Sequence, residues 1–242
     1  MSEMKLPTLM VFDLDDTLYE YDVCDAAGKK ALFEFANVEL GVKSPAFEQA
    51  FTQARINVKE RLGPTASSHS RLLYCHEALE LVGLRSEPNV ALVMEQTYWR
   101  NYLTSMTLRP GALDLLQSLR FNDVVTAVVT DLTAAIQFRK LFHLDIAKHI
   151  DHVVCSEETA QEKLSLQPFQ LLASRVAPES LEHVWFVGDQ DFDAPVDALV
   201  AQGVIKGGHG FVHSAAGRER ISGWRQFREL EDHLEQAAKA SR

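Results

Sequence analysis

Cysteine is scarce in this 242-residue sequence, with only three residues. Cys24, Cys75 and Cys155 lie far apart, and none belongs to a C-x-x-C pair. This spacing excludes a disulfide scaffold and a cysteine-rich zinc site. We therefore expect free thiols in a reducing compartment, which favours a cytoplasmic protein.

Long apolar runs and basic tracts are also missing. Residues 1–7 are mostly polar, and the apolar run after them ends at Phe12, which is too short for a signal peptide or a membrane-spanning helix. Acidic residues outnumber basic ones by 34 to 24, so the formal net charge is −10. We expect neither a membrane nor a nucleic acid as partner. Apolar residues, at 46%, suffice for a globular core.

Short apolar runs alternate with helical segments in most of the sequence. The run Leu9–Phe12 predicts a strand buried on both faces, because it is continuous and ends abruptly in aspartates. Such alternation predicts a doubly wound, Rossmann-like parallel sheet with helices on both faces, an α/β fold. Further strands are expected at 124–129, 152–155 and 183–187, and helices near 112–119, 134–142, 168–176 and 195–201. Val204 and Ile205 then precede a glycine-rich turn and a last helix from about 223 that is solvated beyond 231.

Residues 20–106 do not follow this alternation. Their apolar residues have helical spacing, interrupted by turn-forming residues at 41–45, 63–68 and 83–88. These interruptions predict four helices, with aromatic side chains mostly in their core. We therefore expect an all-helical cap domain at 20–106, inserted into an α/β catalytic core made of residues 1–19 and 107–242.

The ends of the predicted strands carry polar residues of a few kinds. Since ligands bind outside the carboxyl ends of parallel strands, these side chains are expected to meet at one edge of the sheet. Several carboxylates close together repel one another, and a hard divalent cation such as Mg²⁺ would offset that repulsion. The residues concerned are Asp13, Asp15, Thr130, Asp131, Lys163, Asp189, Asp191 and Asp193.

In their order and spacing these residues resemble the four motifs of the haloacid dehalogenase superfamily. The D-x-D-x-T at 13–17 is similar to its first motif and the G-D-x-x-x-D at 188–193 to its fourth. The helical insert after the first motif resembles that of the capped phosphatases. The resemblance implies that Asp13 is the nucleophile and Asp15 the general acid and base. It also implies phosphate-orienting roles for Thr130 and Lys163, and a metal site that we expect to contain Asp13, Asp15, Asp189 and Asp193.

Two assignments have alternatives. Family members commonly have proline after the lysine of the third motif, whereas Leu164 follows Lys163 here, so Lys140 and Lys148 are alternatives. Asp193 is preferred to Asp191 as metal ligand, because its four-residue spacing from Asp189 is the family-like one. Asp131, Arg71 and Tyr74 are candidates for binding substrate.

These features predict hydrolysis of a small phosphomonoester, a sugar phosphate or a nucleoside monophosphate, through an aspartyl-phosphate. A phosphomutase needs the same residues and is an alternative. A hydrolytic dehalogenase is disfavoured, because it needs neither a metal nor an acid such as Asp15. A non-enzymatic binding protein is the weakest alternative, since every catalytic residue type is present. The partner is then a small phosphorylated metabolite, and the protein a monomer or homodimer.

Overall fold

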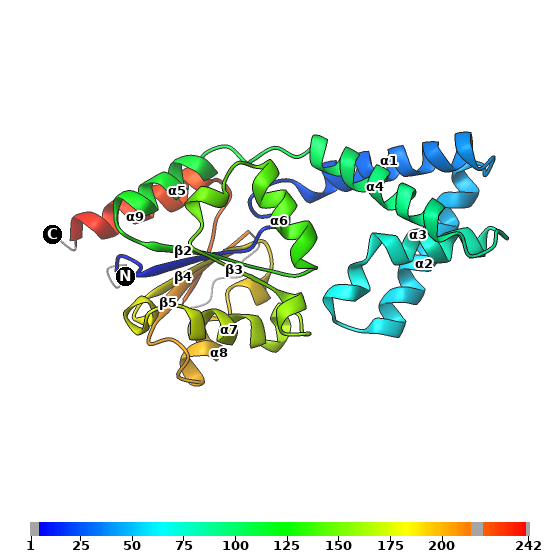
Figure 1. Cartoon of the computed structure of the whole chain (residues 1–242). Helices are drawn as coiled ribbons and strands as arrows, with labels where there is room; N and C mark the ends of the chain where they lie inside the picture. Colours follow the sequence, from blue (N-terminus) through cyan, green and yellow to red (C-terminus); the bar gives the residue numbers. More distant parts are fainter. Residues whose placement is uncertain (1–4, 214–219, 241–242) are drawn as a thin grey trace. The chain divides into compact units, whose positions relative to one another are not determined.

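The computed structural model describes residues 5–213 and 220–240, which form two compact units (Figure 1). One unit contains the described residues up to Glu20 and from Thr107 onward. The other contains Tyr21–Met106. No helix in the described part of the chain has both the length and the apolar character needed to cross a bilayer.

Within the described residues, the first unit is built on six parallel strands in the order β3-β2-β1-β4-β5-β6. This is the doubly wound arrangement, so the predicted fold class is confirmed. β1 is almost completely buried, as its continuous apolar sequence predicts. The strands are β1 Leu9–Phe12, β2 Val125–Thr130, β3 His152–Cys155, β4 Val184–Gly188, β5 Gly208–Val212 and β6 Ile221–Gly223.

Helices cover both faces of this sheet. α5 (Ala112–Phe121), α6 (Ala134–His143) and α9 (Phe227–Ala240) lie on one face, and α7 (Gln167–Arg175) and α8 (Val196–Ala201) lie on the other (Figure 1). The second face packs through apolar side chains, with α7 contributing Phe169 against Phe186 of β4 at 5.8 Å between ring centroids. Burial of this apolar surface fixes the strands whose ends form the site.

The second unit is entirely helical. It contains α1 (Tyr21–Glu39), α2 (Ser44–Leu62), α3 (Arg71–Leu81) and α4 (Pro88–Thr104), together with the short 3-10 helix η1 (Ala66–His69). The aromatic residues of α2, α3 and α4 are largely buried, as expected for a helical unit with a core of its own. Phe47, Phe51, Tyr74, Tyr98, Trp99 and Tyr102 belong to this core.

The C-terminal part of the core differs from the prediction. The glycine-rich segment after Ile205, which was expected to be a turn, contains β5. Here the glycines serve close packing rather than a turn, since a Cβ on Gly210 would lie 2.7 Å from Cβ of Ala194. The three-residue strand β6, paired in parallel with β5, was not predicted at all.

The last helix also differs from the prediction. α9 begins at Phe227 rather than near 223, because β6 takes up the preceding residues. Leu234 and Ala237 are buried, so the segment beyond 231 is not a solvated end. α9 packs against α5 through an apolar stripe. The stripe is hard to recognise in the sequence, because α9 also contains many charged residues.

Candidate active site

The site lies where the order of the strands reverses. β1 stands between β2 and β4, and its last residue, Phe12, pairs with Val128 and Val187. Asp13 follows directly, and its backbone N–H donates to the carbonyl oxygen of Val187 at 2.8 Å. Asp189 likewise follows the last residue of β4. The topology thus brings two aspartates, 176 positions apart in sequence, to the same edge.

Three carboxylates meet at this edge. Oxygens of Asp13, Asp189 and Asp193 lie within 4.8 Å of one another. Nζ of Lys163 contacts the carboxylate of Asp13 and lies 2.5 Å from Oδ1 of Asp193. Asp13, Asp193 and Lys163 are buried, each less than a tenth exposed. One ammonium thus faces three carboxylates, a balance that favours a further cation.

The ionisation of these groups reflects their burial. Burial raises the pKa of Asp13 well above its usual value, and Asp193 adds to this, although the charge of Lys163 opposes it. For Lys163, burial lowers the pKa, but the carboxylates of Asp13 and Asp193 outweigh burial and raise it. Burial and the neighbouring Asp193 also raise the pKa of Asp189. A bound cation would favour the ionised carboxylates.

Asp193 reaches the cluster because Gly188 has no side chain. A Cβ at position 188 would lie 2.1 Å from Cβ of Asp193, which is closer than any real contact. Asp193 closes the 3-10 helix η6 (Asp191–Asp193), where its Oδ2 accepts the backbone N–H of Gln190 at 2.9 Å. Asp191 is exposed and lies outside the carboxylate group. The structure thus places Asp193, rather than Asp191, with Asp13 and Asp189.

Among the three candidate lysines, Lys163 is the one that contacts Asp13. It begins the 3-10 helix η4 (Lys163–Ser165), and its backbone N–H donates to Oδ1 of Asp131 at 3.0 Å. Leu164, which occupies the place of the usual proline, is 78% exposed and leaves the lysine undisturbed. Lys148 pairs instead with Asp145 on the surface.

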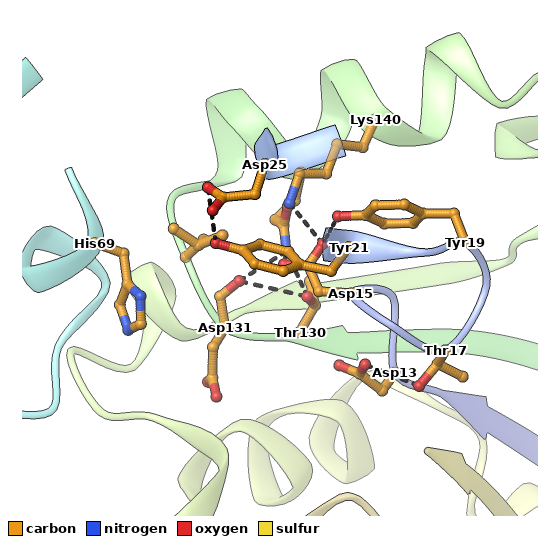
Figure 2. A network of polar contacts seen from close by, with 12 residues as sticks. Asp13, Asp15, Thr17, Tyr19, Tyr21, Asp25, His69, Thr130, Asp131 and Lys140 are labelled. Carbon is orange, nitrogen blue, oxygen red and sulfur yellow. Dashed lines mark hydrogen bonds and ion pairs between the residues drawn. The ribbon is translucent and has the colours of Figure 1, made fainter. Parts of the chain in front are cut away.

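The carboxylate of Asp15 accepts hydrogen bonds from side chains of α6 (Figure 2). Its Oδ1 accepts a hydrogen bond from Nζ of Lys140 at 2.6 Å and another from the hydroxyl of Tyr19, while Oδ2 accepts from Nε2 of Gln137 at 3.2 Å. Burial alone would raise the pKa of Asp15, but Lys140 and these hydrogen bonds lower it overall. Its carboxylate is not among the three clustered carboxylates, so the expected fourth ligand is turned towards other partners.

Two threonines near these aspartates, Thr17 and Thr130, are buried. Thr17 is buried, and its Oγ1 donates to Oδ2 of Asp13 at 3.0 Å. Thr130, at the end of β2, is buried beneath Gln137, whose Nε2 donates to the Thr130 hydroxyl at 2.5 Å and to the carbonyl oxygen of Asp131 at 2.7 Å. The contacts of Thr17 and Gln137 were not predicted, although the D-x-D-x-T pattern contains Thr17.

The two substrate-binding candidates in the helical unit are packed into its interior. Arg71 is buried, and its Nη2 donates to the hydroxyl of Tyr21 at 2.7 Å and lies 3.7 Å from Oδ1 of Asp25. Figure 2 shows Tyr21 in turn beside Asp25, to which it donates at 3.3 Å. The hydroxyl of Tyr74 donates to the carbonyl oxygen of Ser68. Substrate binding by Arg71 and Tyr74 stays a prediction.

Comparison with known proteins decides the family. Residues 7–196 match the model of the haloacid dehalogenase-like hydrolases. The chain belongs to this family. It is 39% identical over 201 residues to the ribulose-1,5-bisphosphate 5-phosphatase of Halopiger xanaduensis, an alignment that covers 82% of this chain and 83% of that protein. The predicted superfamily and the predicted phosphatase class are thereby confirmed.

Solved structures of this family share the fold. The magnesium-bound HAD-hydrolase YfnB of Bacillus subtilis has a TM-score of 0.69 and 19% identity, with 96% of this chain and 99% of that chain covered. A 2-haloacid dehalogenase of Pseudomonas syringae has a TM-score of 0.72 and 18% identity over the same shares of the two chains. At 18% and 19% identity these two likenesses show the fold and not the chemistry.

Proposed function

We propose that this phosphatase hydrolyses a small sugar phosphate, with Asp13 as nucleophile and Asp15 as general acid and base. The observation that carries the proposal is the Asp13 carboxylate, which is buried between Lys163 and Thr17 and grouped with two further carboxylates. The 39% identity to a ribulose-1,5-bisphosphate 5-phosphatase favours a sugar phosphate over a nucleoside monophosphate.

The carboxylate group fits a magnesium ion. Its ligands are all oxygens, from Asp13, Asp189 and Asp193, and hard oxygen ligands are those that Mg²⁺ prefers. Such an ion, when bound, would neutralise charge that develops on the phosphoryl oxygens. A magnesium-bound solved structure with the same fold is consistent with this assignment.

Lys163 and Thr17 prepare Asp13 for attack. Thr17 donates to Oδ2 and Lys163 to Oδ1, so the carboxylate has a fixed orientation. The ammonium of Lys163 also favours the ionised carboxylate, the form that can act as a nucleophile. Lys163, which contacts Asp13 itself, is well placed to stabilise negative charge on the phosphoryl group.

The reaction then has two half-reactions. An oxygen of Asp13 forms a bond to phosphorus, the bond to the ester oxygen breaks, and Asp15 gives that oxygen a proton. In the second half, Asp15 takes a proton from water, whose oxygen attacks phosphorus and releases inorganic phosphate from Asp13. Asp15 serves both halves because a group that has given its proton can accept another.

The carboxylates also separate the alternatives. A hydrolytic dehalogenase needs neither Asp15 nor the pair Asp189 and Asp193, whereas these side chains are buried or half-buried and bonded here. A phosphomutase would use the same residues, and dependence on a phosphorylated sugar cofactor would reveal it. Because the three cysteines are free thiols, we also propose that the enzyme works in the cytoplasm.

We assign selectivity among sugar phosphates to the cap. Arg71 and Tyr74 belong to its packed interior, with the guanidinium of Arg71 lying 5.7 Å from the Tyr74 ring centroid. Substitution of either residue is therefore expected to alter the ranking of substrates through the shape of the cap. An equal loss for every substrate would contradict this role.

A panel of phosphate esters tests the proposal. Release of inorganic phosphate is measured from sugar mono- and bisphosphates, nucleoside monophosphates and p-nitrophenyl phosphate, with Mg²⁺ and after exhaustive treatment with EDTA. We expect the sugar phosphates to be preferred, EDTA to abolish turnover and Mg²⁺ to restore it. Asp13→Asn is the matched inactive control. Preference for nucleotides would overturn the substrate class, and full activity after chelation would overturn the metal.

A further inference from the structure

Lys140 is an unusual residue for the interior of a core. It lies on α6 with its side chain fully buried, and a lysine is buried in this way only when its charge is paired. Its partner is Oδ1 of Asp15, 2.6 Å from Nζ. The ring of Tyr19 lies below the same ammonium, with its centroid 5.7 Å away. A buried charge pair of this kind costs desolvation energy, so packing alone does not account for it.

The contacts of Asp15 are unequal at its two oxygens. Oδ1 receives two hydrogen bonds, from Lys140 and from the hydroxyl of Tyr19. Oδ2 has a longer contact of 3.2 Å with Gln137. The carboxylate is therefore held firmly through Oδ1, and Oδ2 is the oxygen more easily given up to another partner. Figure 2 shows Lys140 and Tyr19 converging on the Asp15 carboxylate.

Lys140 and Asp15 differ in their exposure to solvent, which suits them to different roles. The Asp15 side chain is 23% exposed, whereas that of Lys140 is 0% exposed. The Lys140 side chain is closed to solvent and donates to Asp15, so it can fix the partly exposed carboxylate. Lys140 lies one helical turn after Gln137, so α6 presents both side chains to the same carboxyl group.

We propose that Lys140, assisted by Tyr19, is a positioning residue that fixes Asp15 through Oδ1 and leaves Oδ2 to exchange protons with the leaving group and with water. This inference rests on the proposed role of Asp15 as general acid and base. Without Lys140, Oδ1 of Asp15 loses the hydrogen bond from Nζ, so the carboxylate can rotate and the geometry of proton transfer is lost. A misplacement of about 1 Å in a catalytic group can cost about 10²-fold in rate.

The test is a double-mutant cycle of Lys140→Met and Asp15→Asn. Methionine keeps the length of the side chain and removes its charge. Single-turnover rates are measured for p-nitrophenyl phosphate, which has a good leaving group, and for an alkyl phosphate, which needs a proton. Lys148→Met is the matched control, because Lys148 is an exposed lysine paired with Asp145, and it should retain the wild-type rates.

We expect Lys140→Met to slow the alkyl phosphate about 10²-fold, with a clearly smaller loss for p-nitrophenyl phosphate. In the Asp15→Asn background the same substitution should change neither rate by more than about twofold, because residues that act through one group are not additive. Equal losses for both esters, or an undiminished loss in the Asp15→Asn background, would overturn the inference.

Two further measurements keep these outcomes distinct. If Asp15→Asn itself shows no leaving-group dependence, the proposed role of Asp15 fails, which is a different result from additivity of the two substitutions. Circular dichroism and thermal unfolding check that Lys140→Met folds. If it does not, Tyr19→Phe removes the other donor to Oδ1 and must show the same leaving-group dependence, and equal losses for both esters would again refute the inference.

Discussion

Nζ of Lys163 lies 2.5 Å from Oδ1 of Asp193 while it also contacts the carboxylate of Asp13. One buried ammonium is thus shared by residues that follow two different strands. Burial of these charges costs desolvation free energy, which is offset only while each charge has a partner. Lys163 consequently stabilises the fold of the site as well as the charge of the reaction.

Replacement of Lys163 by methionine should expose this double role. Two buried carboxylates would lose their common partner, a change that typically costs about 3–5 kcal/mol. We expect a lower melting temperature, no measurable turnover, and a larger stabilisation by Mg²⁺ than in the wild type, because the cation would replace the lost charge. Thermal unfolding across a Mg²⁺ titration measures this. Lys206→Met, which removes an exposed pair with Glu182, is the control.

Asp189→Ala should mainly impair use of the metal. Asp189 contributes one of the three clustered carboxylates, whereas the neighbouring Asp191 is exposed and lies outside the cluster. We expect the Mg²⁺ concentration for half-maximal activity to rise by at least tenfold in Asp189→Ala, a loss of about 1.4 kcal/mol in binding, and to be unchanged in Asp191→Ala. Equal behaviour of the two variants would show that the ligand is misassigned.

Gly188→Ala should disturb the site without removing any catalytic group. The added methyl group would lie 2.1 Å from Cβ of Asp193, so Asp193 must move. Overpacking of this kind typically costs about 1–3 kcal/mol. We expect weaker Mg²⁺ activation together with this loss of stability. In Gly223→Ala the new methyl group meets only one atom, at 4.0 Å, so near wild-type behaviour is expected there.

Stability of the core should depend on pH through His209. Burial, together with the smaller effects of nearby His233 and His183, lowers the pKa of this residue from 6.5 to about 4. Between these values the unfolded state binds a proton that the folded state does not, so stability is complete above pH 6.5 and is lost as the pH falls towards 4. Urea unfolding at several pH values should show a shallower loss for His209→Gln. The prediction would be contradicted if the free energy of unfolding fell with pH as steeply in His209→Gln as in the wild type and in the variant of the exposed His143, His143→Gln.

Much of the fold could be predicted because the strands of a parallel sheet are buried on both faces. The continuous apolar run Leu9–Phe12 and the β-branched run at 124–129 give a clear signal of this kind, and each ends in residues of the site. β5 could not be predicted from its glycines, whose lack of side chains serves packing against Ala194 and β4. β6 has three residues and no pattern of its own.

The candidate site divides in the same way. Asp13 and Asp189 could be predicted because each comes directly after a strand, and the topology of a parallel sheet brings the ends of its strands together. Lys140 carries no such signal, since a lysine on an amphipathic helix is usually exposed. Its burial depends on the pairing of α6 with Asp15 across 125 positions, which only the three-dimensional structure shows. The burial of Arg71 among Tyr98 and Trp99 is equally invisible in the sequence.

The roles of Asp13 and Asp15 can be separated by their response to the leaving group. An aspartyl-phosphate cannot form without its nucleophile, so Asp13→Asn should be inactive with every ester. Loss of a general acid typically costs about 10²–10⁴-fold, and this cost should shrink for esters whose leaving group needs no proton. Asp15→Asn should therefore form the intermediate much faster from p-nitrophenyl phosphate than from an alkyl phosphate.

Single-turnover kinetics, with intact-mass detection of a phosphoryl adduct after rapid acid quench, measure both effects. Asp16→Asn is the matched control, because Asp16 adjoins the pair, is half-exposed and has a left-handed backbone conformation that asparagine tolerates. It should retain near wild-type rates with both esters. The adduct should map to Asp13, should persist longer in Asp15→Asn because water is no longer activated, and should be absent from Asp13→Asn. An adduct on another residue, or an Asp15→Asn defect of the same size for both esters, would reverse the assignment.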